Sequence, residues 1–193
     1  MAVYTKIDKK DIQHINNTFN IEKIISFQGI KQGIENTNYL LKSKNKKFIL
    51  TIFEKRVSNK DIPFFMKLMD KLSSSKINCP KPLRTKSNNY QITLKKKIGC
   101  IVSFLQGKDK KKLNFKNCYT VGKVVAQMHL VNKRIKLYRK NSMSIKNLNP
   151  LLKSINYKHN NSKLDLFLKN NLKDINKYWP KKLPNGIIHG DLF

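Results

Sequence analysis

The chain has 193 residues and a formal net charge of +30, from 41 Lys and Arg against 11 Asp and Glu. Apolar residues make up 39% of the sequence and aromatic residues 9%, enough to build a core, which excludes a disordered chain. The positive charge is nearly all Lys and is spread along the chain, together with many Asn and Ile that share A/T-rich codons. The densest Lys runs, 95–97 and 108–112, lack interleaved aromatic residues for base stacking, so we expect no specific nucleic-acid site.

The composition also disfavours secretion, membrane insertion and zinc binding. The opening residues MAVYTKIDKKDIQ contain no apolar signal stretch, and no apolar run approaches the ~20 residues that span a bilayer. Cys79, Cys100 and Cys118 lack zinc-site spacing and are expected to be reduced structural thiols. We therefore expect a soluble, cytoplasmic protein of unknown oligomeric state.

The first part of the chain is typical of β-strands. Apolar runs at 24–27, 38–41 and 48–53 predict three strands, and the turn residues 43–46 predict that the second and third form a hairpin. A loop with two glycines, residues 29–37, joins the first strand to this hairpin.

A helix and two more strands follow. Ser58 or Asn59 can cap the helix, and Pro63 falls in its first turn, where proline is tolerated. Its apolar residues recur at helical spacing, namely Ile62, Phe65, Met66, Met69 and Leu72. Residues 90–94 and 100–105 then predict two strands around a Lys-rich turn.

The remainder is predicted to be helical. One helix begins near Asn114 with an apolar stripe that includes Val121 and Met128, and a second runs over 162–178. The order of elements predicts an α+β architecture of two lobes. Residues 1–106 would form a lobe with an antiparallel sheet plus helix, and 107–193 a partial helical lobe.

Three features carry candidate chemistry. The ending IIHGDLF places Asp191 directly after an apolar run, where it can be held at a cleft and accept a proton, although a turn or helix-cap Asp has the same pattern. The 29–37 loop can bring backbone amides close to phosphates, although it is neither a Walker loop nor GxGxxG. His129 is expected to be a core or helix-packing histidine.

Several blocks together resemble one family. In order, they are MAVYT, GIKQGIENTNYLL, FILTIFEKRV, DIPFFMKLMDKL, INCPKPL, IVSFLQG, GKVVAQMHL and LPNGIIHGDLF. They are similar in order and spacing to homoserine kinases of the aminoglycoside-phosphotransferase-like type. The resemblance implies a protein-kinase-like two-lobe fold with an incomplete C-terminal lobe. It also implies ATP-dependent phosphorylation of the L-homoserine hydroxyl, with ATP and Mg²⁺, on the way to threonine.

The resemblance also implies roles for particular residues. Asp191 corresponds to the catalytic Asp, and His189 to the histidine that supports its loop. Residues 101–107 correspond to the hinge between lobes, where backbone groups near Ser103 and Leu105 would meet the adenine edge. The 29–37 loop corresponds to the nucleotide-covering loop, with candidate residues Gly29, Gly33, Glu35, Asn36 and Thr37.

Two departures from the family pattern stand out. The third strand of kinases carries a Lys that pairs with phosphates and with a helix Glu, but here Thr51 occupies that position. Lys55 and Arg56 are the candidate substitutes, and the helix offers only Asp61 and Asp70. The family's metal-binding Asn and Asp are expected beyond Phe193, so no metal ligand is predicted within the chain, and we expect an inactive fragment.

Two alternatives remain open from the sequence. One is another kinase of the same superfamily, acting on choline, an amino sugar or methylthioribose. The other is a basic, non-catalytic binding protein. The kinase readings predict a small-molecule substrate and no membrane partner.

Overall fold

The computed structural model describes residues 3–107, 110, 112–142, 144–156, 162–180 and 182–191. The chain forms two compact units, Met1–Leu137 together with Ile187–Phe193, and Tyr138–Gly186. The first unit runs past residue 106, so the predicted lobe boundary does not coincide with the boundary between the units, and it stays a prediction.

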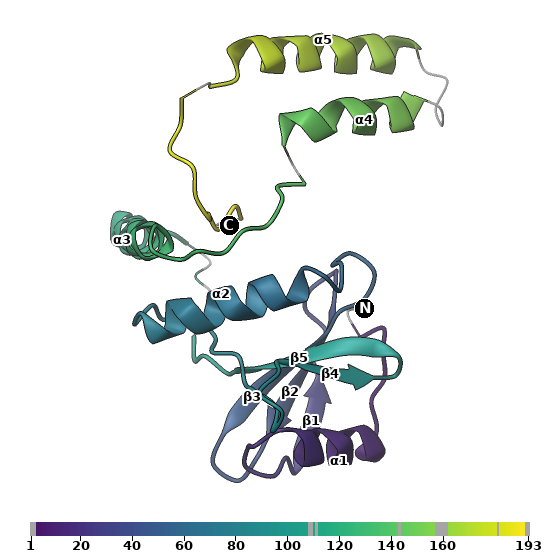
Figure 1. Ribbon diagram of the computed structural model, residues 1–193, viewed down its shortest axis with the longest axis vertical. Helices are drawn as coiled ribbons and strands as arrows, with labels where there is room; N and C mark the ends of the chain where they lie inside the picture. The colour runs from purple at the N-terminus through teal and green to yellow at the C-terminus, as the bar shows by residue number, and fades with distance from the viewer. Residues whose placement is uncertain are drawn as a thin grey trace. The chain divides into compact units, whose positions relative to one another are not determined.

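An antiparallel sheet of five strands organises the first unit (Figure 1). The strands follow the order β1-β2-β3-β5-β4 across the sheet. Their bounds are β1 Ser26–Gly29, β2 Thr37–Lys42, β3 Lys47–Ile52, β4 Gln91–Leu94 and β5 Lys97–Ser103. Both hairpins predicted from the turn residues are present, and the expected antiparallel sheet is confirmed.

The central strand β3 is flanked on both edges and directs alternate side chains to opposite faces. Leu50 and Ile52 are fully buried on one face, together with Leu41 of β2 and Ile101 of β5. Thr51 and Ile49 lie on the other face, because successive residues of a strand alternate.

Helix α1 (Lys9–Thr18) covers the face that carries Leu50. It was not predicted from the sequence, although Ile12, Ile15 and Phe19 have the spacing of a helical core stripe. Its start is fixed by a capping box, in which the Asp8 side chain accepts from the third helical residue and the Asp11 side chain accepts from the Asp8 N–H.

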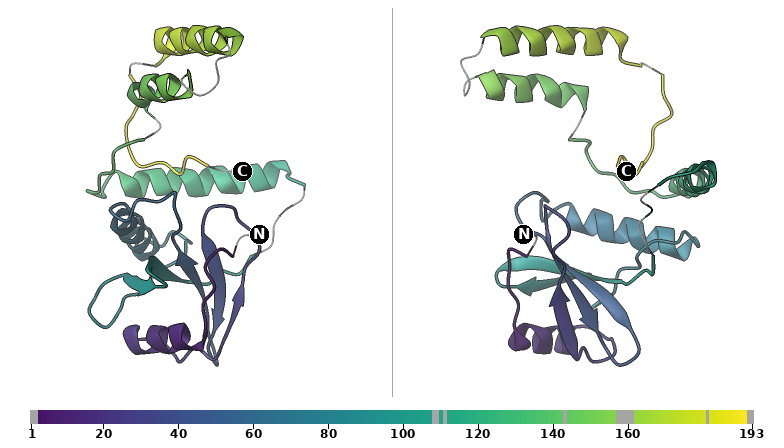
Figure 2. Two further views of the ribbon diagram at one scale, coloured as in Figure 1. Left: turned by 90° about the vertical axis from the view of Figure 1, so that its right-hand side faces the viewer. Right: turned by 180° about the vertical axis from the view of Figure 1, so that it is seen from behind.

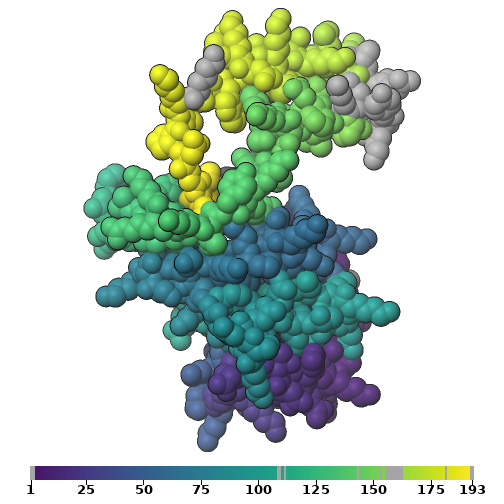
Figure 3. Space-filling model, viewed as in Figure 1, coloured from purple at the N-terminus to yellow at the C-terminus, as the bar shows by residue number. Residues whose placement is uncertain are grey.

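Lys95 joins α1 to the β4–β5 hairpin. Its Nζ lies 2.7 Å from Asp8 Oδ2 and 3.1 Å from Asp11 Oδ2. The turn that presents it is tight, since Lys95 and Lys96 both have positive φ. The space-filling view shows the purple N-terminal region packed against the teal hairpin (Figure 3).

Helix α2 (Ile62–Ser74) packs on the opposite face, so the sheet lies between α1 and α2 in every view (Figure 2). The predicted cap at Ser58 or Asn59 is wrong. The Ser58 carbonyl accepts the Asp61 N–H at 2.9 Å, which closes a separate turn, and the helix begins afterwards with Asp61 at its N-cap.

Three further helices follow. Asn114 caps α3 (Phe115–Asn132) by accepting the Asn117 N–H at 2.9 Å. In the second unit α4 (Ile145–Asn156), which was not predicted, lies beside α5 (Ser162–Tyr178), which was. Apolar side chains of α3 and α5 are largely exposed, including Val121 and Phe167. No helix within the described residues is long and apolar enough to cross a bilayer.

The packing of α1 can be tested with one buried and one exposed isoleucine. Ile15 is 0% exposed and Ile25 is 68% exposed. We expect Ile15→Ala to lower the free energy of unfolding by roughly 2–5 kcal/mol because it leaves a cavity. Ile25→Ala should change it by only about 0.5 kcal/mol. Urea unfolding followed by circular dichroism measures both, and equal effects would contradict the placement of α1.

Candidate active site

An uncovered apolar strip lies on the face of the sheet that α2 shares. Helix α2 covers Phe53, Tyr90 and Cys100 on this face. Leu40 of β2 pairs with Ile49 of β3, which pairs with Val102 of β5. These three side chains are half-buried, and they lie outside the cluster beneath α2. We call them the apolar strip; apolar side chains are the usual lining of a site for an aromatic ring.

The predicted hinge leaves the sheet at the end of β5. The Ser103 N–H donates to the Lys81 carbonyl, and the Lys81 N–H donates to Ser103 Oγ, both at 2.9 Å. The Phe104 N–H donates to the Lys47 carbonyl at 3.3 Å. Ser103 is therefore committed to the protein itself. Leu105 is 39% exposed, and within the described residues its N–H has no hydrogen-bond partner.

The 29–37 loop is fastened at several points. The Ile30 N–H donates to the Asn38 carbonyl at 2.8 Å, and the Tyr4 hydroxyl donates to the Ile34 carbonyl at 2.9 Å. Glu35 forms an exposed ion pair with Arg56. Asn36 Oδ1 accepts the Glu54 N–H at 3.3 Å. The loop is therefore tied both to the chain's first described residues and to the segment after β3.

The two glycines of this loop serve different ends. A Cβ on Gly29 would lie 2.9 Å from Val3 Cγ2, so glycine here permits a close approach of the N-terminal residues. Gly33 has a φ of +100°, in the region that favours glycine.

Thr37 ends the loop, and its hydroxyl has no free hydrogen-bonding site. The side chain is 0% exposed, and Oγ1 accepts the N–H of Tyr4 at 2.9 Å and of Thr5 at 3.1 Å. It donates to Glu54 Oε1 at 2.6 Å. A hydroxyl has one donor and two acceptor sites, so all are used. Any contact of Thr37 with a ligand would fall to its backbone.

Glu54 accepts from three side chains. Its Oε1 also accepts the Thr5 hydroxyl at 2.7 Å, and its Oε2 pairs with Lys97. Burial alone raises the pKa of Glu54, but the hydrogen bonds from Lys97, Thr37 and Thr5 outweigh it and hold the pKa below its ordinary value of 4.5. We call Thr5, Thr37, Glu54 and Lys97 the Glu54 network; no local sequence pattern predicts it.

Lys97 does not replace the missing third-strand Lys. It has the same parity as Ile101, which pairs with Leu50, so it lies on the α1 face, opposite the apolar strip. Thr51, in the kinase Lys position, donates its hydroxyl to Asn38 Oδ1 at 2.7 Å. Lys55 and Arg56 are exposed just after β3.

Asp70 of α2 is bonded to two side chains outside its own helix. Asp70 Oδ2 accepts from Tyr90 and from Arg84, both at 2.6 Å. Burial raises the pKa of Tyr90, and the neighbouring Asp70 raises it further, to about 12. This cluster fastens α2 to the sheet, so Asp70 does not stand in for the helix Glu of kinases.

The predicted catalytic residues lie in a short segment near the C-terminal end. Asn132, at the end of α3, donates from Nδ2 to the Ile187 carbonyl at 2.9 Å. The His189 ring accepts the Asp191 N–H at Nδ1, at 3.3 Å, across Gly190, whose φ is +79°. His189 thus contacts the backbone of the residue it was expected to support. His129 is exposed among the described residues, which contradicts the core alternative; the helix-packing alternative stays a prediction.

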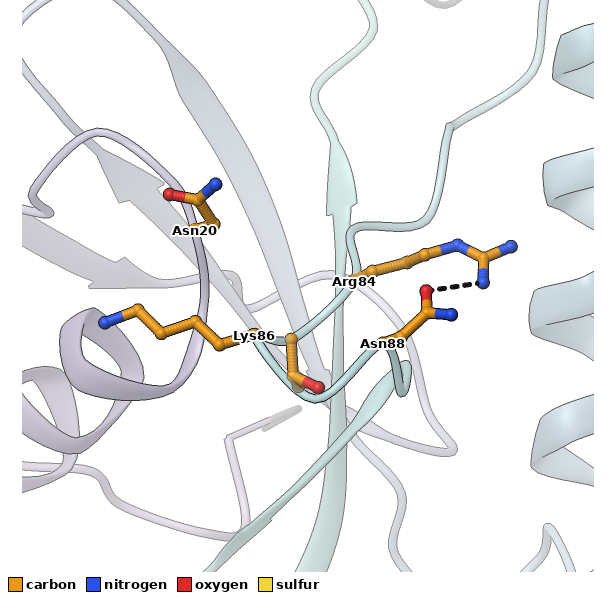
Figure 4. Close-up of a pocket in the computed structure, with 5 residues that line it drawn as sticks. Asn20, Arg84, Lys86 and Asn88 are labelled. Atoms are coloured by element: carbon orange, nitrogen blue, oxygen red, sulfur yellow. Dashed lines mark hydrogen bonds between the residues drawn. The ribbon is translucent and has the colours of Figure 1, made fainter.

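A pocket beside α1 is a poorer candidate. It is lined by Asn20, Arg84, Thr85, Lys86 and Asn88. Figure 4 shows Arg84 and Lys86 pointing in opposite directions, with Arg84 bonded to Asn88 at 2.9 Å. Its charged groups do not converge on one ligand. Within the described residues, no group of three or more His, Cys, Asp or Glu side chains could hold a metal ion.

The sequence matches the model of the phosphotransferase enzyme family over residues 26–193. The chain belongs to this family. It is 35% identical over 195 residues to the homoserine kinase of Paramagnetospirillum magneticum, and 36% identical over 198 residues to that of Rhodopseudomonas palustris strain BisA53. These alignments cover 100% of this chain and 60% of each relative, so the chain spans about three fifths of their length.

Solved structures share the fold. Spectinomycin phosphotransferase with ADP and spectinomycin superposes with a TM-score of 0.65 and 18% identity, covering 97% of this chain and 64% of that one. A microcompartment-associated aminopropanol kinase superposes with a TM-score of 0.57 and 13% identity, over 74% of this chain and 48% of that one. These likenesses confirm the expected kinase-like fold.

Asn132 offers a test of how the 187–191 segment is held. Its side chain is buried, and Oδ1 has no hydrogen-bond partner among the described residues. Asn132→Leu should therefore cost little global stability, since it removes an unsatisfied polar atom. It should still speed amide hydrogen exchange over 187–191, because the bond to Ile187 is lost. Gln127→Leu, on the exposed side of α3, is the control, and equal exchange in both variants would contradict this role.

The Glu54 network predicts a pH dependence. Because the folded protein holds the pKa of Glu54 below 4.5, the stabilisation from its carboxylate is complete above pH 4.5 and is lost as the pH falls through the folded pKa. The difference in unfolding free energy between wild type and Glu54→Gln should be constant above pH 4.5 and shrink below it. Urea titrations at a series of pH values measure this difference; a gap that widens on acidification would contradict the assignment.

Proposed function

We propose that this chain provides the nucleotide-binding sheet and the catalytic Asp of an ATP-dependent kinase that phosphorylates the hydroxyl of L-homoserine. The observation that carries the nucleotide part is the apolar strip, which is flanked by the fastened 29–37 loop and by the exposed Leu105 backbone. The substrate rests on the full-chain similarity to homoserine kinases. The proposed activity is that of a protein of the relatives' full length, of which this chain matches about three fifths.

Each part of the site has a separable task. The apolar strip would pack against the adenine ring, and the Leu105 N–H would donate to its edge. Backbone amides of the 29–37 loop, around Gly29, Gly33, Glu35 and Asn36, would lie over the phosphates. The bound nucleotide, with Mg²⁺, supplies the phosphoryl group and neutralises its charge.

Asp191 would act on the acceptor. Its carboxylate would take the proton from the homoserine hydroxyl as that oxygen attacks phosphorus. His189 would hold the segment in shape through the bond from the Asp191 N–H. The product, O-phosphohomoserine, would be an intermediate in threonine biosynthesis. A cytoplasmic location would suit this reaction.

The alternatives from the sequence differ in support. The family match favours a kinase over a basic binding protein. Kinases acting on choline, an amino sugar or methylthioribose share the family, and the similarity to homoserine kinases over the whole chain favours L-homoserine over them.

Asp191 can be tested in a chain extended with the part of the Paramagnetospirillum magneticum relative that this chain does not match. We expect Asp191→Asn to lower kcat about 10²–10⁴-fold and to leave ADP binding unchanged, because the carboxylate acts in the transfer step. A coupled ADP-release assay with L-homoserine, choline, an amino sugar and methylthioribose measures turnover, and calorimetry measures binding. Near-normal turnover in the variant would remove Asp191 from catalysis. Preference for another alcohol would overturn the substrate.

A further inference from the structure

The first described residues of the chain pack against the 29–37 loop from outside the sheet. We call residues 3–7 the N-terminal arm. The Thr5 carbonyl accepts the Tyr39 hydroxyl at 2.9 Å, and the Ile7 N–H donates to the same hydroxyl at 3.3 Å. The Val3 side chain fills the space that a Cβ on Gly29 would need. The arm therefore runs along β2 toward the loop, and both views of Figure 2 show the start of the chain beside it.

The arm reaches the loop through direct hydrogen bonds. Tyr4 bonds to the Ile34 carbonyl through its hydroxyl and to Thr37 Oγ1 through its N–H. Glu54 extends the same set, since it receives the hydroxyls of Thr5 and Thr37 and donates its own N–H to Asn36. Three of the last four residues of the loop region, Ile34, Asn36 and Thr37, are thereby held by groups outside the loop.

Lys97, at the start of β5, adds a fourth segment of the chain to these hydrogen bonds. Its Nζ pairs with Glu54 and donates to Thr5 Oγ1 at 2.7 Å. The Glu54 side chain is only 10% exposed. A carboxylate so little exposed is costly unless its oxygens are bonded, and bonds to a charged partner are the stronger kind. Removing Lys97 would leave that carboxylate without its counter-charge.

The Glu54 network cannot touch a nucleotide on the apolar strip. Lys97 lies on the α1 face of the sheet, whereas Leu40, Ile49 and Val102 lie on the other face. Any effect of Lys97 on nucleotide binding must therefore pass through the loop.

We propose that the N-terminal arm and the Glu54 network are positioning elements that set the conformation of the 29–37 loop for nucleotide binding. The inference rests on the proposed function for the loop's role in binding. Tyr4, Thr5, Glu54 and Lys97 are its positioning residues. The loop is pre-formed by bonds on the far face of the sheet, so that its backbone amides need little ordering when a nucleotide binds.

The hairpin supplies a matched control two residues away. Lys95 forms ion pairs with Asp8 and Asp11 of α1, and its interactions among the described residues include no hydrogen bond or ion pair to Thr37 or Glu54. Lys95→Met and Lys97→Met each remove one positive charge from the same β4–β5 hairpin. Both should lower the melting temperature, but only Lys97→Met should disturb the loop.

The experiment compares these variants in the 193-residue chain. Amide hydrogen exchange over residues 30–37, measured without nucleotide, should speed up about tenfold in Lys97→Met and stay at the wild-type rate in Lys95→Met. The Kd for ADP, measured by calorimetry, should rise about tenfold in Lys97→Met alone, the fold-change expected for one lost charge-assisted hydrogen bond. Lys97→Arg should restore both values.

Tyr4→Phe is a second variant that tests the same role if Lys97→Met does not fold. The Tyr4 residue is 56% exposed, and this change removes only the hydroxyl that bonds to Ile34. It should speed exchange at residues 34–36 and raise the Kd for ADP with no change in melting temperature. Unchanged exchange over the loop in both Tyr4→Phe and Lys97→Met overturns the proposal. Wild-type chain that binds no ADP, but whose loop still loosens in these variants, contradicts the nucleotide-binding function and leaves the positioning role supported.

Discussion

The carboxylate of Glu54 is the point at which four distant parts of the chain meet. It accepts the hydroxyls of Thr5 and Thr37 and pairs with Lys97, so the N-terminal arm, the start of β2, the end of β3 and the start of β5 share one partially enclosed charge. A carboxylate in such surroundings requires these partners, because burial alone favours its protonated form. The carboxylate keeps all of these partners only when the strands are in this register, the 29–37 loop is closed and the N-terminal arm follows this path.

The alternation of side chains across β3 separates structure from binding. Even-numbered residues of β3 face α1 and form the main core, and Glu54 continues the same side beyond the strand. Odd-numbered residues of β3 lie on the other face of the sheet, which carries the apolar strip and packs against α2. One face can thus be rigid and fully bonded while the other stays open to a ligand. The positioning role proposed for Lys97 depends on this division, because Lys97 lies on the α1 face and the apolar strip lies on the other face.

The strands and the long helices could be predicted from the sequence because their signals are local. The hairpin turn before Lys47, the helical stripe of α5 and the Asn114 cap each lie within a few residues of what they determine. Helix α1 was missed because it is short and its cap is Asp8 with Asp11, a weaker signal than Ser or Thr with Glu.

The Glu54 network was out of reach for a different reason. Its members lie 17 to 92 residues apart, and only the register of the strands brings them together. The blocks MAVYT and FILTIFEKRV carry part of the family resemblance, yet a sequence pattern does not show on which side of the sheet Thr5 or Glu54 lies. The same holds for Asn132, whose partner Ile187 is 55 residues away.

Acidic residues are few in this chain compared with basic residues. With 11 Asp and Glu against 41 Lys and Arg, a carboxylate is easily supplied with a cationic partner. Among the described residues of the first unit, the other acidic side chains are engaged in hydrogen bonds, ion pairs or electrostatic contacts, as Glu35, Glu54 and Asp70 illustrate. Asp191 is the exception within that part, since only its backbone N–H is bonded.

An unpaired carboxylate is the form that proton abstraction needs. A cation bonded to such a carboxylate would occupy the oxygen that must receive the hydroxyl proton. The segment instead satisfies its backbone through His189 and Asn132, which holds Asp191 in place without using its side chain. The proposed catalytic role of Asp191 needs a side chain of this kind, whereas the side chain of a turn or cap residue is bonded to its own backbone.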